Sequence, residues 1–467
     1  MPKTQRVRDP VHGLIVFHKD EPLDQLAWSL LDTPEFQRLR RIKQLGVSEF
    51  VFPNATHSRF AHSIGVFHTA RQLVKIIRRE VGSATYDPRR AEVAVIAALL
   101  HDVGHGPFSH TFEGVQKSRG VAKRHEQWTA DIIRSHDGAI RPLLDAYRKD
   151  GSFTEEVAGL LEAEDPTDIY HAVVSSSFDA DRLDYLRRDR LMTGTGAGAI
   201  DFDWLTEQVR VREITIDADA GNLDGEPRRV PAFCFDAKAL PAAERFLLAR
   251  YALYEQVYLH KTTRCVEEMI GKLLERVATL ANEAATAPEQ TGLAPEHPIL
   301  RFFADGGATL TNYLDLDDAV LAGAIEQMVR GGDAVVRDLG RRLRERRLYK
   351  TLDVRAFGHE EGHQRLAARR IDQANQAKRF SGAVIKDEGA GVSIYTQIGG
   401  DDDKAHKRLH VFDEAEGPVE ITRVSPMIMA LVQKRSSPGT TSRTKWIAIG
   451  RDRRKRRSGA AAIGVTR

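Results

Sequence analysis

The chain has 467 residues, of which 42% are hydrophobic and 29% are charged, as in an ordinary soluble globular protein. The sequence has neither an apolar run long enough to cross a bilayer nor an apolar N-terminal signal, which argues against a membrane or secreted protein. A net charge of +3 does not imply a nucleic-acid partner, and two cysteines are too few for a disulfide framework. These features predict a cytoplasmic protein.

Helices are predicted throughout the first half of the chain. Thr33 and Pro34 begin one of them, because a hydroxyl side chain caps free N–H groups and proline loses nothing at the first helical position. Apolar residues at helical spacing continue this helix to Leu45, and Gly46 suits its C-terminal cap. A second helix is predicted over residues 59–79.

The next predicted helix, over residues 91–102, is apolar nearly all round, so it belongs inside the core. Alternating residues then predict strands over residues 211–217 and 230–236, which can pair across the turn-forming residues between them. Helical periodicity returns over residues 242–277, with a bend, and a linker rich in Ala, Pro and Glu is predicted over residues 282–298.

The last part of the chain has a different pattern. Short strands between glycine turns are predicted in GAVIKDEG, VSIYTQIGG, KRLHVFDE and GPVEITRV, from residue 383 onward. The predicted fold class is therefore mainly α, with a helical body and a smaller α+β C-terminal part. We expect the body to span residues 1–380, with its core at about 36–190, and the smaller part to span 381–450. The basic residues 451–467 predict a mobile tail, although such a run can also bind nucleic acid.

The stretch ALLHDVGHGPFSHTFEG carries the clearest chemical signal. An apolar helix ends in His101 and Asp102, and the chain then breaks at two glycines. Buried imidazole and carboxylate groups are costly unless something uses them, and a divalent metal is a natural user. A complete site needs more ligands, and His62 and Asp181 are candidates because both lie in predicted helices with apolar neighbours.

Each of these residues alone has a simpler explanation, since a lone histidine on an apolar face is usually a core residue with a hydrogen-bond partner. Together with their neighbours they resemble a known family. The stretches THSRFAHSIGV, LLHDVGHGPFSHTFEG, RHEQ and DADRLDYLRRD are similar to the HD-domain deoxynucleoside triphosphate triphosphohydrolases. The branch they resemble most includes the vertebrate sterile-alpha-motif HD protein and its bacterial, dGTPase-like relatives. The similarity runs from residues 9–13 to residues 346–350.

The resemblance implies a set of metal ligands and catalytic residues. It implies that a Mn, Fe or Zn ion binds to His62, His101, Asp102 and Asp181, and that Mg accompanies the triphosphate. It implies that His125 protonates the leaving 5′ oxygen and that Glu126 orients His125. The histidines that it places along the phosphate site are His105 and His110, and His110 is a second candidate for the proton donor.

The resemblance also implies a substrate site. It places Arg59, Arg182 and Arg250 on the triphosphate, where three cations and a metal would offset several negative charges. For Arg250 alone, a solvated basic face is an equally good explanation. The residues that it places near the sugar and base are Gln44, Leu45, Tyr185, Asp189 and Tyr258.

A regulatory site is implied in the same way. Asp32, Gln37, Arg40 and Arg346 match residues that grip a guanine nucleotide between subunits in the regulated relatives. The resemblance therefore implies a GTP or dGTP activator and a homotetramer or homodimer. The simpler interpretation is that DTPEFQRLR is only a well-capped amphipathic helix.

The predicted function is thus a metal-dependent dNTP triphosphohydrolase that releases deoxynucleoside and inorganic triphosphate. One alternative is an HD phosphohydrolase for a nucleoside monophosphate, an alarmone or a cyclic dinucleotide, because the metal ligands alone do not select the substrate. Another is a non-enzymatic scaffold or nucleic-acid-binding protein, against which the intact ligand set and His125 argue.

Overall fold

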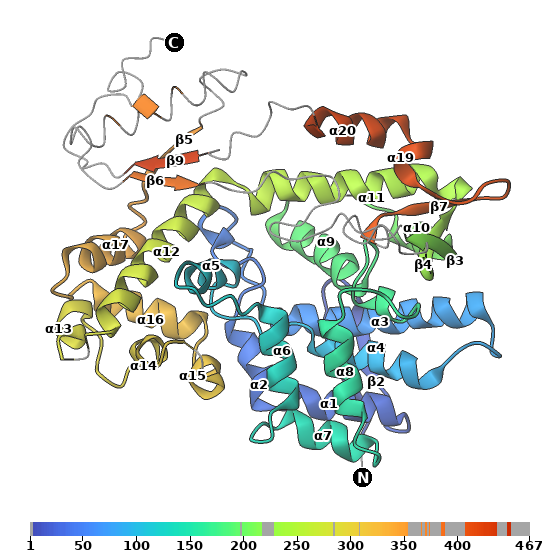
Figure 1. Ribbon diagram of the computed structural model, residues 1–467, viewed down its shortest axis with the longest axis horizontal. Helices are drawn as coiled ribbons and strands as arrows, with labels where there is room; N and C mark the ends of the chain where they lie inside the picture. The colour runs from blue at the N-terminus through green and yellow to red at the C-terminus, as the bar shows by residue number, and fades with distance from the viewer. Residues whose placement is uncertain are drawn as a thin grey trace.

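Figure 1 shows a body built mainly from helices, with short strands at its margins, so the prediction of a mainly α fold is confirmed. The structure is a computed structural model. It describes residues 3–353 apart from 197–198, 217–227, 284 and 308, together with 366, 369–370, 373, 384–387, 407–436 and 446–449. Among these residues, no helix is both long and apolar enough to cross a membrane.

Three helices form the centre of the body: α3 (Arg59–Val81), α4 (Pro88–Leu100) and α9 (Ala180–Thr193). α3 packs against both of the others. Each helix begins at a side-chain cap, because Ser58, Asp87 and Asp179 accept hydrogen bonds from backbone N–H groups of the first turn. The apolar residues of α4 are buried on every side, as the sequence predicts.

Other helices of the first half surround these three. They are α1 (Pro22–Leu31), α2 (Pro34–Arg38), α5 (His110–Ser118), α6 (His125–Arg134), α7 (Ile140–Tyr147), α8 (Phe153–Glu162) and α10 (Phe202–Glu207). Short 3-10 turns lie at Leu39–Arg41, Ser48–Phe50, His171–Val173 and Ala237–Ala239. The N-terminal residues form an antiparallel hairpin of β1 (Gln5–Asp9) and β2 (Gly13–Phe17), which the sequence analysis does not predict.

The predicted continuous helix from Pro34 to Leu45 is wrong. It ends as α2 and a 3-10 turn, because tertiary hydrogen bonds replace the helical ones after residue 41. The carbonyl of Ile42 accepts from the N–H of Arg59 at 2.8 Å, and the N–H of Gln44 donates to the carbonyl of His57 at 2.9 Å. The chain therefore lies extended beside the start of α3 and brings Gln44 to the edge of the site described below.

A bent helical run crosses the middle of the molecule, as predicted. α11 (Leu240–Leu253) passes through a π-helical turn (Tyr254–Tyr258) and is followed by α12 (Lys261–Ala281). α12 forms a second core with the helices that follow it (Figure 1). These helices are α13 (Ala287–Thr291), α14 (Pro298–Ala304), α15 (Leu310–Leu314), α16 (Asp318–Met328) and α17 (Ala334–Arg344). α13 lies inside the predicted linker, which is therefore partly helical.

Strands from distant parts of the chain share two sheets. β3 (Val209–Ile216) pairs antiparallel with β4 (Arg228–Asp236), as predicted. β4 also pairs parallel with β7 (His410–Asp413), which in turn pairs with β8 (Gly417–Glu420). The second sheet has the order β5 (Lys350–Asp353), β9 (Trp446–Ile449) and β6 (Val384–Asp387). Both sheets join strands from the two sides of residue 380, and the domain boundary expected there stays a prediction.

The C-terminal part otherwise follows the expected pattern with one correction. GPVEITRV is a strand only in its first half, and its second half is the short helix α19 (Ile421–Val424), which α20 (Pro426–Ser436) follows. The N–H of Ile421 donates to the carbonyl of Leu409, and this bond turns the chain out of the sheet. The predicted strand VSIYTQIGG and the basic tail at residues 451–467 lie outside the described residues.

Candidate active site

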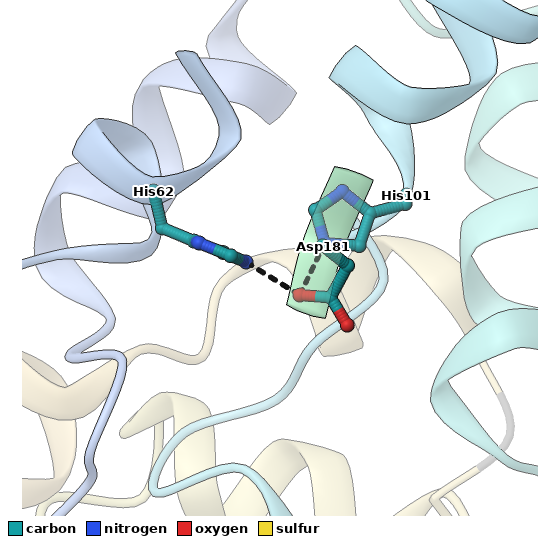
Figure 2. A group of neighbouring side chains, drawn as sticks. All are labelled: His62, His101 and Asp181. Carbon is teal, nitrogen blue, oxygen red and sulfur yellow. Dashed lines mark hydrogen bonds and ion pairs between the residues drawn. The ribbon is translucent and has the colours of Figure 1, made fainter. Parts of the chain in front are cut away.

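The predicted metal ligands meet where α3, the end of α4 and the start of α9 converge, and Figure 2 draws three of them. His62 Nε2 lies 2.9 Å from Asp181 Oδ1, and His101 Nε2 lies 3.7 Å from the same oxygen. Asp102 lies 3.3 Å from His101 Nε2 and 3.8 Å from His62 Nε2. Two ligand atoms at about 2.1 Å from one ion lie about 3.0–3.4 Å apart. His62, His101 and Asp181 each offer a ligand atom within 4.8 Å of the others, which is close enough to hold one ion after small shifts, and Asp102 lies beside this group.

The chemistry of the donor set also fits a divalent ion. Two imidazole nitrogens and two carboxylates suit Mn, Fe or Zn. His101 Nε2 is buried and has no hydrogen-bond partner among the described residues, while its Nδ1 is fixed 2.8 Å from the carbonyl of Ala98. Such a nitrogen is costly to bury unless it binds something, which supports its role as a ligand.

Asp184 orients His62 from behind. Its Oδ2 lies 2.7 Å from His62 Nδ1, which turns Nε2 of the same ring toward Asp181. Burial lowers the pKa of His62, but hydrogen bonds to Asp181 and Asp184 outweigh it and raise the pKa to about 10. Gly65 makes room for this contact, because a Cβ at residue 65 would lie 1.9 Å from Asp184 Oδ1. The two carboxylates therefore favour positive charge at His62, which a bound cation would supply in place of the proton.

Arg59 links the metal site to the loop after α4. Its guanidinium donates to Asp102 Oδ2 at 2.7 Å and to Ser109 Oγ at 2.9 and 3.1 Å. Burial would raise the pKa of Asp102, but the positive charge of Arg59 and the nearby imidazoles hold it well below its usual range. Asp102 is therefore ionised, and Arg59 is fixed at the position where the resemblance places a phosphate contact.

Three histidines beside the metal ligands form a second group. The ring of His125 stacks on that of His105 with centroids 3.9 Å apart, and His110 meets both rings edge-on. Two carboxylates face His125 Nδ1: Glu126 at 3.4 Å and Glu113 at 3.5 Å. Burial lowers the pKa of His125, but these carboxylates outweigh it and raise the pKa above that of an ordinary histidine.

A cavity of about 250 Å³ opens over these groups. The residues that line it are Gln44, Leu45, Gly46, Ser48, Arg59, His101, Asp102, His105, Phe108, Ser109, His110, His125, Glu126, Asp181, Tyr185, Asp189, Tyr254, Tyr258, Arg264 and Glu267. The structure thus brings most of the predicted catalytic and substrate residues to one place. Arg182 and Arg250 are buried but are not among the described residues that line the cavity. The guanidinium of Arg182 pairs with Asp179, and that of Arg250 lies 5.9 Å from the ring centroid of Tyr254.

Polar atoms in this cavity are either tightly held or left for a ligand. Both oxygens of Asp189 are engaged, one with the hydroxyl of Tyr258 at 2.6 Å and one with His57 Nε2 at 2.8 Å. The hydroxyl of Tyr185 and Oε1 of Gln44 are buried and have no hydrogen-bond partner among the described residues. A hydroxyl-bearing ligand between them would satisfy both atoms.

The predicted regulatory residues lie together on the surface side of α2, apart from Arg346. Arg40 donates to Gln37 Oε1 at 2.7 Å and lies over the ring of Phe60, and Asp32 is the exposed C-terminal cap of α1. Arg346 donates to the carbonyl of Phe50 at 2.8 Å. These positions are compatible with a site at a subunit surface, and the regulatory role stays a prediction.

Several site residues are missed by the sequence analysis. They are His57, Ser109, Glu113, Asp184, Tyr254, Arg264 and Glu267. Asp184 could have been found, because it follows Asp181 by three residues and so lies on the same face of α9. His57 lies in a loop, and no periodicity marks its contact with Asp189.

Comparisons with known proteins identify the family of the chain. The HD domain family matches residues 59–186, and the HD associated region matches residues 231–291. The uncharacterized protein YwfO of Bacillus subtilis is 33% identical over 348 residues, which are 74% of this chain and 71% of YwfO. Human SAMHD1, named a deoxynucleoside triphosphate triphosphohydrolase, is 31% identical over 56% of this chain, and its Dictyostelium discoideum homolog is 33% identical over 57%. The matches span less than half the length of these two SAMHD1 proteins.

A solved structure supports the fold. A phosphohydrolase from Bacteroides thetaiotaomicron superposes with a TM-score of 0.69 at 24% sequence identity, covering 96% of this chain and all of that one.

Removing His101 is expected to weaken metal binding, because it takes away one of the three neighbouring side chains that could hold the ion. Loss of an outer partner of a ligand already costs about 10–100-fold in metal affinity, so His101→Ala should cost at least as much. An ion that binds the native state raises Tm, so calorimetry with increasing Mn²⁺ measures the effect. His136→Ala, an exposed position outside the site, is the control. Equal responses of both variants to Mn²⁺ would contradict the ligand assignment.

Proposed function

Because this chain belongs to the HD-domain family of metal-dependent phosphohydrolases, we propose that it hydrolyses deoxynucleoside triphosphates to deoxynucleoside and inorganic triphosphate. One observation carries the proposal: a single cavity is lined by three of the four candidate metal ligands, His101, Asp102 and Asp181, together with polar groups suited to a sugar. A generic phosphatase has no need of Tyr185, Asp189 and Tyr258 beside its metal.

The phosphate end of the cavity is built to bind and orient anions. A divalent ion on His62, His101, Asp102 and Asp181 would supply Lewis acidity and an activated water. Arg59 adds a guanidinium that Asp102 and Ser109 hold in one orientation, so little side-chain entropy is lost when it binds a phosphate.

His125 is the proposed proton donor. The bond that breaks joins the α-phosphorus to the 5′ oxygen, and the leaving alkoxide needs a proton. Glu113 and Glu126 favour the protonated form of His125, whereas burial and the neighbouring Arg59 and His125 lower the pKa of His105 well below its usual range. The two stacked rings therefore differ in pKa, and a proton is held more readily by His125 than by His105, which supports His125 as the acid. His110 is the second candidate, but its side chain is 66% exposed and less constrained.

The sugar end supports a nucleoside substrate. Gln44 and Tyr185 offer unused buried polar atoms, and the Asp189–Tyr258 hydrogen bond holds the facing wall rigid. We propose that these groups, with Leu45, contact the deoxyribose, and that Arg182 and Arg250 contact the triphosphate after a change of side-chain conformation.

Metal, activator and assembly are part of the same proposal. We propose Mn, Fe or Zn at the HD site and Mg on the triphosphate. We further propose that GTP or dGTP binds near Asp32, Gln37, Arg40 and Arg346 and assembles a homotetramer or homodimer. A cytoplasmic location is supported by two free, buried thiols, Cys234 and Cys265, which suit a reducing compartment.

The reaction itself is tested by incubating the purified chain with each dNTP and rNTP plus Mn²⁺ or Mg²⁺ and separating the products by chromatography. Inorganic triphosphate and deoxynucleoside are the expected products. His125→Ala should lower kcat by about 10²–10⁴-fold, since it removes the general acid, while His136→Ala keeps the wild-type rate. Pyrophosphate or monophosphate as product would instead favour the alternative nucleotide substrates, and a fully active His125→Ala variant would remove His125 from the mechanism.

Tyr185→Phe is expected to separate substrate binding from stability. Loss of one hydrogen bond to the sugar should raise KM for a dNTP by about 2- to 12-fold. The free energy of unfolding should stay equal or rise, because the buried hydroxyl has no hydrogen-bond partner in the described part of the chain. Tyr170→Phe is the matched opposite: its hydroxyl accepts from the N–H of Asp87 at 2.7 Å, far from the cavity, so stability should fall and KM stay constant. Steady-state kinetics and urea unfolding of both variants decide the point.

Nucleotide-driven assembly is tested by light scattering with and without dGTP. We expect a larger species in its presence, and Gln37→Ala should abolish the change because Gln37 also fixes Arg40. A monomer under both conditions would exclude the regulatory proposal and leave the catalytic one intact.

A further inference from the structure

A turn from the second half of the chain supports the active site from behind. We call it the support turn and define it as residues 313–318, which run from the end of α15 to the first residue of α16. The catalytic loop, residues 101–110, lies directly against it. We infer that Asp318 of the support turn is a positioning residue that holds two walls of the substrate cavity in register. The inference rests on the proposed function of that cavity.

The carboxylate of Asp318 joins the two walls. Its Oδ1 accepts from the N–H of Phe108 at 2.7 Å, and its Oδ2 accepts from the N–H of Lys43 at 2.9 Å. Phe108 lies in the catalytic loop two residues before His110, and Lys43 directly precedes Gln44. Asp318 is buried, with 4% of its surface exposed, so neither bond competes with water. One side chain therefore sets the distance between the two walls.

The backbone at the first contact is strained. Phe108 and Ser109 have φ angles of 50° and 48°, a region that residues with a Cβ rarely occupy. Such a conformation persists only where its surroundings hold it, and such sites are often functional. Here the strained pair places the hydroxyl of Ser109 on Arg59, which bonds Asp102. Asp318 is thus connected to the candidate metal ligand Asp102 through the side chains of Ser109 and Arg59.

Other members of the support turn hold the same loop. The hydroxyl of Tyr313 donates to the carbonyl of Gly104 at 2.7 Å, and its ring stacks on Trp128 with centroids 4.0 Å apart. Buried Arg38 donates both to the carbonyl of Leu316 at 2.9 Å and to that of His105 at 2.8 Å. The support turn therefore fixes the catalytic loop at Gly104, His105 and Phe108.

Burial disfavours the charged form of Asp318, and two backbone N–H groups stabilise it. Burial raises its pKa to about 6, although hydrogen bonds from Lys43 and Phe108 oppose the rise. A neutral amide at this position would accept only one of the two N–H groups, because its other polar atom is a donor. A carboxylate is the side chain that can hold both walls at once.

The test compares Asp318→Asn with Asp315→Asn, a control in the same turn whose side chain is 44% exposed and pairs only with Arg301 among the described residues. Tyr313→Phe serves as a second test variant, because it removes a single hydroxyl and keeps the stacked ring. We expect Asp318→Asn and Tyr313→Phe to lower kcat on dNTP by about 10- to 100-fold, as a misplaced catalytic group does. The Mn²⁺-dependent rise in Tm should be kept, and Asp315→Asn should match the wild type.

Hydrogen exchange followed by mass spectrometry gives a readout independent of activity. In Asp318→Asn, peptides covering residues 101–110 and 42–48 should exchange faster than in the wild type, while peptides from α12 should not change. Unchanged exchange in both peptides, or an unchanged kcat in both test variants, would overturn the inference. If the wild type itself releases no triphosphate, the proposed function fails, and the exchange data still decide the role of Asp318. A merely structural role would lower Tm without the loss of kcat in folded protein at 25 °C.

Discussion

The crowding of the buried Asp102 and Asp184 beside the partly exposed Asp181 is the constraint on which the rest of the site depends. Carboxylates in a protein core lose hydration that costs several kcal/mol each unless cations or hydrogen bonds replace it. Arg59 offsets the charge of Asp102, and Arg188 donates two bonds to Asp184 at 2.8 and 2.9 Å. These two arginines offset the cost of burying Asp102 and Asp184. Asp181 is left beside His62 and His101, and these three side chains could hold a metal ion.

The charged and imidazole side chains of the site come from the ends of helices rather than from their middles. His101 and Asp102 follow α4, Asp181 lies in the first turn of α9, and His125 begins α6. The side-chain cap at Asp179 fixes the first turn of α9, and the buried faces of the three helices pack into a single core. Rigid helices thus hold the candidate metal ligands, and the loop after α4 carries the groups that are predicted to act on the substrate.

Local signals in the sequence predict the helices with their own caps and faces. α3 and α4 agree with prediction because the signals that mark them, the caps and the buried apolar residues, lie within each segment or next to it. The helix expected up to Leu45 fails because its fate is decided by partners that are far away in sequence, among them Asp318 and His57. His62, His101 and Asp181 lie in local motifs, so the sequence alone identifies them as candidates. His57, Ser109 and Asp318 are recognised by contacts with residues that are distant in sequence, so only the folded structure identifies them.

The parallel pairing of β4 with β7 has a consequence for how the chain can be divided. Without the residues after 380, β4 would present a row of unpaired N–H and C=O groups along one side, while β3 covers only the other. Open edges of this kind recruit strands from other molecules. The C-terminal hairpin of β7 and β8 therefore covers this edge of the sheet. Expression of the helical body by itself would expose the edge of β4 and favour self-association.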